Sequence, residues 1–451
     1  MLYRKKEKDI LKWIKKSEKA LLVTGARQVG KTYLIRKCLE KAKCDYVEFN
    51  LIENPKLVNI LESANNMDEL IMGLSLFANK KIEKYKTYIF FDEIQKYKEI
   101  VTKIKFFVDD GSFRFILSGS LLGVEIVNLK SAPVGYLQTI TMYPLDFEEF
   151  LQVFNVQDSL IQNLYSCFCE KKPVNETINA KMLDIFNNYL IVGGMPSAVA
   201  KYKESSNIDD IIIEHNSIVE QYKNDFTRYE EENKKLLLNN IYDLIPSEIG
   251  EKNKRFNFSD IKKKLKFERY ENNFLWLKNA GVALPVYNVT EPKTPLLISE
   301  KRNLFKLFLS DVGLLTTIYG KNSKIKILTK DTNINNGSVF ENVVAQELYA
   351  HNIKPYYFNS KKQGELDFVI EYKGKVLPIE VKSGKDYDKH SALKNVLQNN
   401  NYGIDEAFVF ANTNVKNAGN ITYYPIYMCM FLKDECDKEI KLEKIDMSMY
   451  S

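Results

Sequence analysis

Short apolar runs alternate with helical patterns over the first 150 residues of the chain. Strands that alternate with helices in this way indicate a mostly parallel sheet covered on both faces. The predicted strands are Leu21–Thr24, Asp45–Asn50, Thr87–Phe91, Phe113–Ser118 and Gln138–Met142. Residues 1–150 are therefore predicted to form one α/β domain, which begins with a charged amphipathic helix within residues 1–18.

The pattern becomes helical after this domain. Residues 151–234 are predicted to be helical, with a turn at Val192–Pro196, where two glycines and a proline follow one another. Residues 235–320 have the order of a winged helix, because helical segments precede two predicted strands at Val282–Val289 and Leu296–Ser299. We therefore expect a helical connector followed by a winged-helix-like region.

The last part of the chain has the pattern of a separate domain. Residues 321–336 are rich in Lys, Asn and Thr and are predicted to be a linker. In residues 337–451 a helical segment precedes strands, which indicates a second α/β domain. The strands predicted there are Leu366–Tyr372, Lys375–Val381 and Ala407–Phe410.

Composition narrows the class of protein. The chain has 451 residues, of which 45% are hydrophobic and 27% charged, as in ordinary multidomain globular proteins. No apolar run approaches the ~18 residues that a membrane helix needs, and the basic N-terminus lacks the apolar core of a signal peptide. Six cysteines without a C-x-x-C pair and only three histidines argue against a zinc site. We expect a cytoplasmic protein without a membrane partner, and the net charge of +6 permits contact with nucleic acid.

A complete phosphate-binding motif, G-x-x-x-x-G-K-[ST], lies between the first predicted strand and a helix. A loop in this position points backbone N–H groups and the positive end of a helix dipole at a phosphate. Lys31 would reach the β- and γ-phosphates, and the Thr32 hydroxyl would bind Mg²⁺. The predicted nucleotide-binding residues are Gly25, Ala26, Arg27, Gln28, Val29, Gly30, Lys31 and Thr32.

Two later strands end in polar residues that suit the same site. The apolar run before Asp92 and Glu93 predicts a strand that ends in two carboxylates. In P-loop proteins the first acid orders the Mg²⁺ shell and an adjacent Glu accepts a proton from water, so we assign Asp92 to the metal and Glu93 to catalysis. Ser118, at the end of the next strand, is the predicted sensor of the γ-phosphate or the water. These residues, with Lys31, favour ATP hydrolysis.

Several segments together resemble a family of prokaryotic AAA-type ATPases. They are residues 25–32, Phe91–Lys96, Leu117–Ser120, Tyr143–Leu151, Tyr189–Pro196 and Phe308–Leu315. Members of this family carry a C-terminal domain of unknown function with a restriction-endonuclease-like core, and the resemblance implies the same organisation here. Many members have an Arg where Tyr136 follows Gly135. If that Arg acts on the phosphates, Arg228 and Arg114 are the candidates to replace it here, although a charged surface role fits either residue better.

The C-terminal domain carries an Asp…Glu-x-Lys pattern, which resembles that of restriction-endonuclease-like folds. Glu380 and Lys382 lie two residues apart on one predicted strand and therefore face the same side, towards Asp367 on the strand before it. The two carboxylates would hold Mg²⁺ for phosphodiester hydrolysis, and Lys382 would position water or stabilise charge. Glu341, on the preceding helix, is a further candidate ligand.

Two hypotheses of function remain open, and ATP and Mg²⁺ are the predicted cofactors in both. In the first, ATP hydrolysis controls a winged helix and a metal-dependent nuclease on DNA. The basic segments Lys252–Arg255 and Lys262–Lys266 would then contact phosphates. In the second, the chain is a nucleotide-dependent switch whose inactive nuclease-like domain binds DNA, a partner protein or another copy of the chain.

Overall fold

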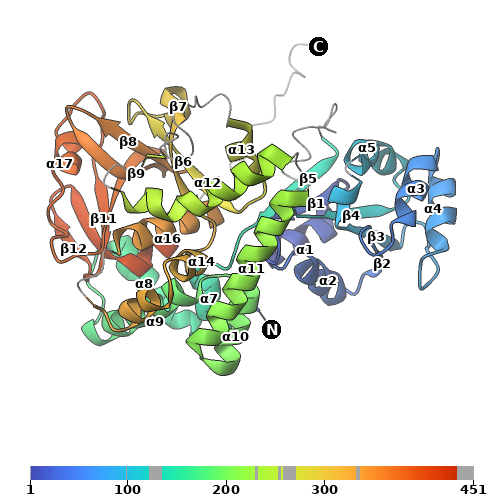
Figure 1. Cartoon of the computed structure of the whole chain (residues 1–451), viewed down its shortest axis with the longest axis horizontal. Coiled ribbons are helices and arrows are strands. Elements are labelled where there is room, and N and C mark those ends of the chain that lie inside the picture. The colour runs from blue at the N-terminus through green and yellow to red at the C-terminus, as the bar shows by residue number, and fades with distance from the viewer. Residues whose placement is uncertain are drawn as a thin grey trace, which may run out of the picture.

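The computed structural model describes residues 2–97, 99–120, 135–228, 232–251, 255–256, 271–331 and 336–433. Figure 1 shows a five-stranded sheet at one end of the molecule, in blue and cyan, and an eight-stranded sheet at the other, in yellow to red. The green helices α10 (Pro196–Ser205) and α11 (Ile208–Arg228) lie between them. None of the helices in the described ranges has the length and apolar character that a membrane span requires.

The N-terminal sheet is parallel, with the strand order β2-β3-β4-β1-β5. Its strands are β1 (Ala20–Gly25), β2 (Asp45–Asn50), β3 (Thr87–Asp92), β4 (Arg114–Ser118) and β5 (Leu137–Met142). Successive residues face opposite cores, because Leu21 packs into one cluster and Leu22 into the other. The predicted parallel sheet and its strands are confirmed.

Helices cover both faces of this sheet. Ile10 of α1 (Glu7–Lys16) and Leu34 of α2 (Lys31–Lys41) belong to the same core as Leu21. The other face is covered by α3 (Lys56–Ser63), α4 (Met67–Ser75) and α5 (Ile100–Asp110). Both faces of the sheet are therefore shielded from water, which explains why the strand sequences are continuous apolar runs.

A helical region follows the sheet. Its helices are α7 (Phe147–Val153), α8 (Asp158–Glu170), α9 (Glu176–Val192), α10, α11 and α12 (Glu232–Gly250). The turn between α9 and α10 is held by backbone contacts, because Leu145 N donates to Gly194 O over 2.7 Å and Gly194 N donates to the Asp311 carboxylate over 2.6 Å. A Cβ atom at Gly194 would lie 2.0 Å from Leu145 O, so only glycine fits.

The second sheet has the strand order β12-β13-β11-β10-β9-β8-β6-β7. Its strands are β6 (Ala283–Val289), β7 (Glu300–Leu309), β8 (Tyr356–Ser360), β9 (Gly364–Tyr372), β10 (Lys375–Lys382), β11 (Ala407–Ala411), β12 (Lys416–Ala418) and β13 (Ile421–Pro425). The hairpin β6–β7 corresponds to the predicted wing, but β6 pairs in parallel with β8. The sheet therefore spans the expected boundary between residues 235–320 and 337–451.

Two expectations from the sequence are corrected. Leu296–Ser299 is a 3₁₀ helix, η4, and the strand begins only at Glu300. The first half of the predicted linker is the helix α15 (Lys321–Leu328), which buries Lys324 against the carbonyl oxygens of Ile191 and Gly313. A flexible linker would leave this lysine in water.

The predicted basic segments fall largely outside the described residues. This holds for residues 252–254 and 262–266 and for most of the segment between α12 and α13 (Glu271–Asn279). The winged helix and its phosphate contacts therefore stay predictions.

Helix α16 (Gly337–Ala350) is the centre of the C-terminal part. It contacts β6, β7 and β10 of the sheet, and also α12, α14 (Val312–Ile318) and the 3₁₀ helix η5 (Ile426–Phe431). The outer side of the sheet is covered by α17 (Ser391–Leu397), which packs on β9. Because α16 is buried on several sides, its polar residues must find partners inside the protein.

Candidate functional site

The phosphate-binding loop leaves β1 and opens α2, as the motif predicts. Gly25 has φ +133°, and a Cβ atom there would lie 2.1 Å from Met142 O on the neighbouring strand β5. Lys31 is buried and donates to the carbonyl oxygens of Gly25 over 3.1 Å and Ala26 over 2.7 Å. In this structure the Lys31 ammonium group is therefore hydrogen-bonded to carbonyl oxygens of its own loop.

Burial lowers the pKa of Lys31 to about 8, although the carboxylates of Glu93 and Asp92 act in the opposite direction. An ammonium group without water is less stable than the neutral amine, which explains the direction of this shift. A phosphate beside Lys31 would restore the charge.

The predicted metal-binding residues meet at the carboxyl ends of neighbouring strands. The Thr32 hydroxyl donates to Asp92 Oδ2 over 2.8 Å. Asp92 Oδ1 accepts from the Ser118 hydroxyl and from Glu93 N, the latter over 3.0 Å. Ser118 is fully buried, so its hydroxyl fixes the orientation of Asp92.

One residue beside Glu93 received no role from the sequence. Gln95, in the 3₁₀ helix η1 (Ile94–Lys96), is buried and donates to Glu93 Oε2 and, over 3.3 Å, to Ser120 Oγ. Glu93 itself has φ +56°, an uncommon left-handed conformation that directs its side chain. The available signal in the sequence was the side-chain amide of Gln95, two residues after Glu93, within hydrogen-bonding reach of the carboxylate.

Helix α11 holds the phosphate-binding loop from outside. The Arg27 guanidinium pairs with Asp225 over 2.5 Å, and Tyr222 Oη donates to Arg27 O over 3.2 Å. Gln28, which has φ +64°, donates to Gln221. The side chains of Arg27 and Gln28 are therefore engaged with the helix.

The two candidate arginines differ in what the structure says of them. Arg114 is the first residue of β4, at the end of the strand opposite Ser118, and donates to Ile14 O over 2.6 Å. Arg114 therefore does not reach the phosphate-binding loop. The side chain of Arg228 lies outside the described part of the chain.

A mainly apolar cavity of about 470 Å³ adjoins the loop. It lies where the N-terminal segment, the start of α2 and the start of α10 meet, and Tyr33 on its wall is 46% exposed. Residues that line it include Leu2, Val29, Gly30, Tyr33, Pro196 and Ala200.

The C-terminal candidates form a second site. Asp367 on β9 and Glu380 on β10 are buried, and Lys382 Nζ donates to Glu380 Oε1 over 2.6 Å. Asp367 Oδ2 accepts from Val381 N over 2.9 Å. Burial, together with Asp367 and Glu341, raises the pKa of Glu380 to about 8, with Lys382 acting against them. The four predicted residues therefore lie in one electrostatic cluster.

A lysine from the predicted wing also belongs to this cluster. Lys306 on β7 is 1% exposed and pairs with Glu365 over 2.7 Å. Its Nζ lies 4.0 Å from both Glu341 Oε2 and Asp367 Oδ1. The sequence analysis missed Lys306 because the wing was expected in another domain.

The charges of the C-terminal cluster do not balance. Its four carboxylates are those of Glu341, Glu365, Asp367 and Glu380, and its two ammonium groups are those of Lys306 and Lys382. Counted as fully ionised, four carboxylates and two ammonium groups have a formal charge of −2, and a proton on Glu380, whose pKa is raised to about 8, reduces it to −1 at neutral pH. Glu380 Oε2 is buried and has no hydrogen-bond partner among the described residues.

A cleft of about 850 Å³ begins where β10 ends. It is lined by Ser383 and Gly384, which follow Lys382, and by Phe340, which precedes Glu341. Lys330 and Lys385 lie on its wall. The cleft therefore lies beside the segments that carry Glu341 and Lys382, and its wall holds Asp331 as well as the two lysines.

Family models match three successive segments of the chain. Residues 17–151 match a family model described as an AAA domain. Residues 183–325 and 336–428 match two models described as domains of unknown function, DUF8612 and DUF4143. No curated protein matches the chain. The AAA match and the P-loop between β1 and α2 identify an AAA-type P-loop ATPase domain.

Solved structures of nucleotide-binding proteins are distant from this chain. The Walker-type ATPase PABY2304 of Pyrococcus abyssi is 14% identical, with 71% of this chain and 96% of that one covered and a TM-score of 0.43. Cdc6p from Pyrobaculum aerophilum is 13% identical over 72% and 93%, with a TM-score of 0.24. The RuvB Holliday junction branch migration motor of Thermotoga maritima is 13% identical over 68% and 92%, with a TM-score of 0.30.

Proposed function

We propose that this protein binds ATP with Mg²⁺ at the phosphate-binding loop and hydrolyses it. The observation that carries this proposal is the contact of 2.8 Å between Thr32 and Asp92, with Glu93 next in the chain. A hydroxyl and a carboxylate are the hard oxygen donors that Mg²⁺ prefers, so these residues fit the ion. When bound, it would neutralise charge on the β- and γ-phosphates.

The remaining roles follow from the contacts. Lys31 would turn from its two carbonyl partners to the phosphates and regain its proton there. Glu93 would hold the attacking water and accept its proton, while Gln95 fixes the carboxylate by a hydrogen bond. Ser118 would act indirectly, by orienting Asp92.

The cavity beside the loop is the proposed site of the nucleobase. It adjoins Gly30 at the start of α2, and its apolar walls suit a planar base that stacks on the ring of Tyr33. Ala200→Trp would fill the cavity without touching the phosphate contacts. We expect this variant to bind ATP at least tenfold more weakly and inorganic pyrophosphate unchanged.

The test of hydrolysis is the variant Glu93→Gln. It keeps the hydrogen-bonding shape but cannot accept a proton, so nucleotide binding should persist while turnover falls by roughly 10²–10⁴-fold. Glu99→Gln, an exposed neighbour, is the matched control and should retain full turnover. Hydrolysis by Glu93→Gln at the wild-type rate would refute the assigned role.

We further propose that the C-terminal cluster binds a divalent cation and cleaves phosphodiesters in DNA. The negative charge of the cluster and the unpartnered oxygen of Glu380 support a bound M²⁺ ion. The adjoining cleft, with Lys330 and Lys385, suits a polyanionic backbone. The nuclease-like domain and its action on DNA rest on this proposal.

Nicking of supercoiled DNA with Mg²⁺ or Mn²⁺ tests the second proposal. Wild type and the exposed control Asp386→Asn should nick DNA, whereas Asp367→Asn and Lys382→Met should not. Absence of nicking in every nucleotide state would instead favour the switch, in which this domain only binds DNA, a partner protein or a second copy.

A further inference from the structure

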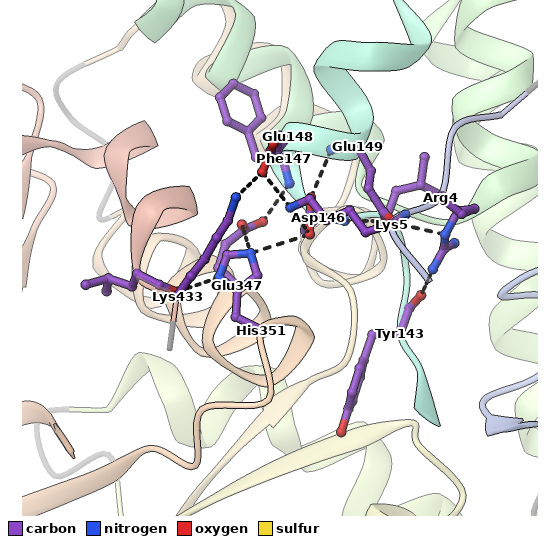
Figure 2. Close-up of polar contacts among 12 residues, drawn as sticks. Arg4, Lys5, Tyr143, Asp146, Phe147, Glu148, Glu149, Glu347, His351 and Lys433 are labelled. Carbon is purple, nitrogen blue, oxygen red and sulfur yellow. Dashed lines mark hydrogen bonds and ion pairs between the residues drawn. The ribbon is translucent and has the colours of Figure 1, made fainter. Parts of the chain in front are cut away.

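A third polar cluster lies where the ATPase domain meets the C-terminal part (Figure 2). Asp146 precedes α7, whereas Glu347 is on α16 and His351 follows that helix. Their side chains are at most 4% exposed. Each residue offers one possible ligand atom, and these three atoms lie within 4.8 Å of one another. The three residues are therefore close in space although they are far apart in the sequence.

The hydrogen bond of His351 determines which ring nitrogen is free. Nδ1 lies 2.7 Å from the carbonyl oxygen of Leu432, which can only accept, so Nδ1 carries the proton. Burial lowers the pKa of His351, which favours the neutral ring. Nε2 then presents a lone pair and has no hydrogen-bond partner among the described residues.

Nε2 of His351 faces two carboxylate oxygens. Asp146 Oδ2 lies at 3.4 Å and Glu347 Oε2 at 3.8 Å. Glu347 uses its other oxygen to accept from Phe147 N, over 2.8 Å, and leaves Oε2 without a hydrogen bond from any described residue. Asp146 uses Oδ1 to cap Glu149 N, and its Oδ2 accepts from Lys5 Nζ over 2.6 Å. The three ligand atoms therefore lie within 4.8 Å of one another, and those of His351 and Glu347 have no hydrogen-bond partner among the described residues.

The surrounding basic residues do not satisfy all of this charge. Lys5 pairs with Asp146 and Glu148, Lys433 with Glu148, and Arg4 with Glu149. Among the residues that the structure describes, no lysine or arginine lies within 4.0 Å of the Glu347 carboxylate. Counted as ionised, four carboxylates against three basic residues leave one formal negative charge, at Glu347. Burial, together with Asp146, raises the pKa of Glu347 to about 8, so this charge is held by a proton at neutral pH that a metal ion would displace.

We propose that Asp146, Glu347 and His351 bind one divalent transition-metal ion, for which Zn²⁺ is the best match. Imidazole and carboxylate ligands suit zinc, at bonds of about 2.0–2.2 Å, which place the ligand atoms of a tetrahedral site roughly 3.3–3.6 Å apart. The distance of 3.4 Å meets this requirement, and that of 3.8 Å needs a shift of tenths of an ångström. Water would be the fourth ligand.

The second shell is also in place for a metal. The Nδ1–H group of His351 is oriented by a backbone carbonyl, the usual partner of a metal-binding histidine. Phe147 N and Tyr189 Oη hold Glu347 Oε1, so Oε2 is directed at the site. The ion would join α7 of one part of the chain to α16 of the other and stiffen their contact.

Metal content of the full-length protein tests this proposal. The Asp367→Asn variant is freed of metal with a chelator and titrated with Zn²⁺ or Co²⁺ in the absence of nucleotide, so that neither the carboxylate cluster around residue 367 nor the phosphate-binding loop contributes. We expect one equivalent to bind, the Co²⁺ form to show the visible absorption of a four-coordinate site, and the midpoint of thermal unfolding to rise.

Four variants separate the possible sites. Glu347→Gln and His351→Gln should weaken binding by more than the roughly 10–100-fold that loss of a second-shell partner costs. In the same background, Asp386→Asn, an exposed carboxylate, and His390→Gln, a histidine elsewhere in the fold, should leave this binding unchanged. Glu347→Gln can still accept from Phe147 N, so it should fold if His351→Gln does not.

Two results would overturn the proposal. One is a folded wild-type protein that binds no Zn²⁺ or Co²⁺ at micromolar concentration, in which case a proton occupies the cluster. The other is unchanged stoichiometry and affinity in a folded Glu347→Gln variant, which would place the metal elsewhere.

Discussion

ATP binding should be linked to protonation of Lys31, because this buried lysine has a pKa of about 8 when only the loop surrounds it. At pH 7 the free protein then carries the proton in about 90% of molecules, and at pH 9 in about 10%. Phosphate oxygens require the charged form. ATP binding at pH 9 should therefore take up about 0.9 protons, and the affinity should fall about tenfold between pH 7 and 9, or about 1.4 kcal/mol.

Isothermal titration calorimetry in two buffers of different ionisation enthalpy measures this uptake directly. The control is Lys31→Arg, whose guanidinium stays charged throughout this range and should show no uptake. A wild-type protein that takes up no proton at pH 9, or a Lys31→Arg variant with the wild-type uptake, would refute the assignment to Lys31.

Two further predictions concern contacts that no motif revealed. A Cβ atom at Gly281 would lie 2.9 Å from Ala26 N in the phosphate-binding loop, so Gly281→Ala should weaken ATP binding severalfold in a fluorescent-nucleotide titration; Gly320→Ala, which also has positive φ but open space, should not. Lys306→Met leaves Glu365 without its buried partner and should lower the free energy of unfolding by about 3–5 kcal/mol in urea, with Mg²⁺ restoring part of the loss.

The ATPase domain was predictable because its strands are buried on both faces. Such strands read as uninterrupted apolar runs, and their carboxyl ends meet at one edge of the sheet. Thr32, Asp92 and Ser118 were therefore expected to converge, and their side chains are hydrogen-bonded to one another. The pattern could not predict that the Ser118 hydroxyl donates to Asp92, because this hydrogen bond depends on side-chain rotamers and burial.

The second sheet was only partly predictable because its pairing is not local. The hairpin β6–β7 has a local signal, but no sequence pattern announces that β6 pairs with β8 across the intervening helices. Lys306 consequently stayed outside the predicted site, although it lies within 4.0 Å of two of the predicted carboxylates. His351 and Asp146 received no role from the sequence, because the small number of histidines argued against a zinc site and no local spacing joins residues 146 and 351.

These nonlocal contacts join the two candidate sites in one structure. Ala26 of the phosphate-binding loop lies against Gly281, and β6 begins two residues after this glycine. β6 pairs with β7, which carries Lys306 into the carboxylate cluster. A shift of the loop backbone on nucleotide binding must therefore be absorbed at the start of β6 or passed along the hairpin, because no spare space separates the two backbones. Gly320 also has positive φ, but a Cβ atom there would touch no other segment. Comparison of Gly281→Ala with Gly320→Ala therefore separates the effect of the contact with Ala26 from that of backbone strain alone.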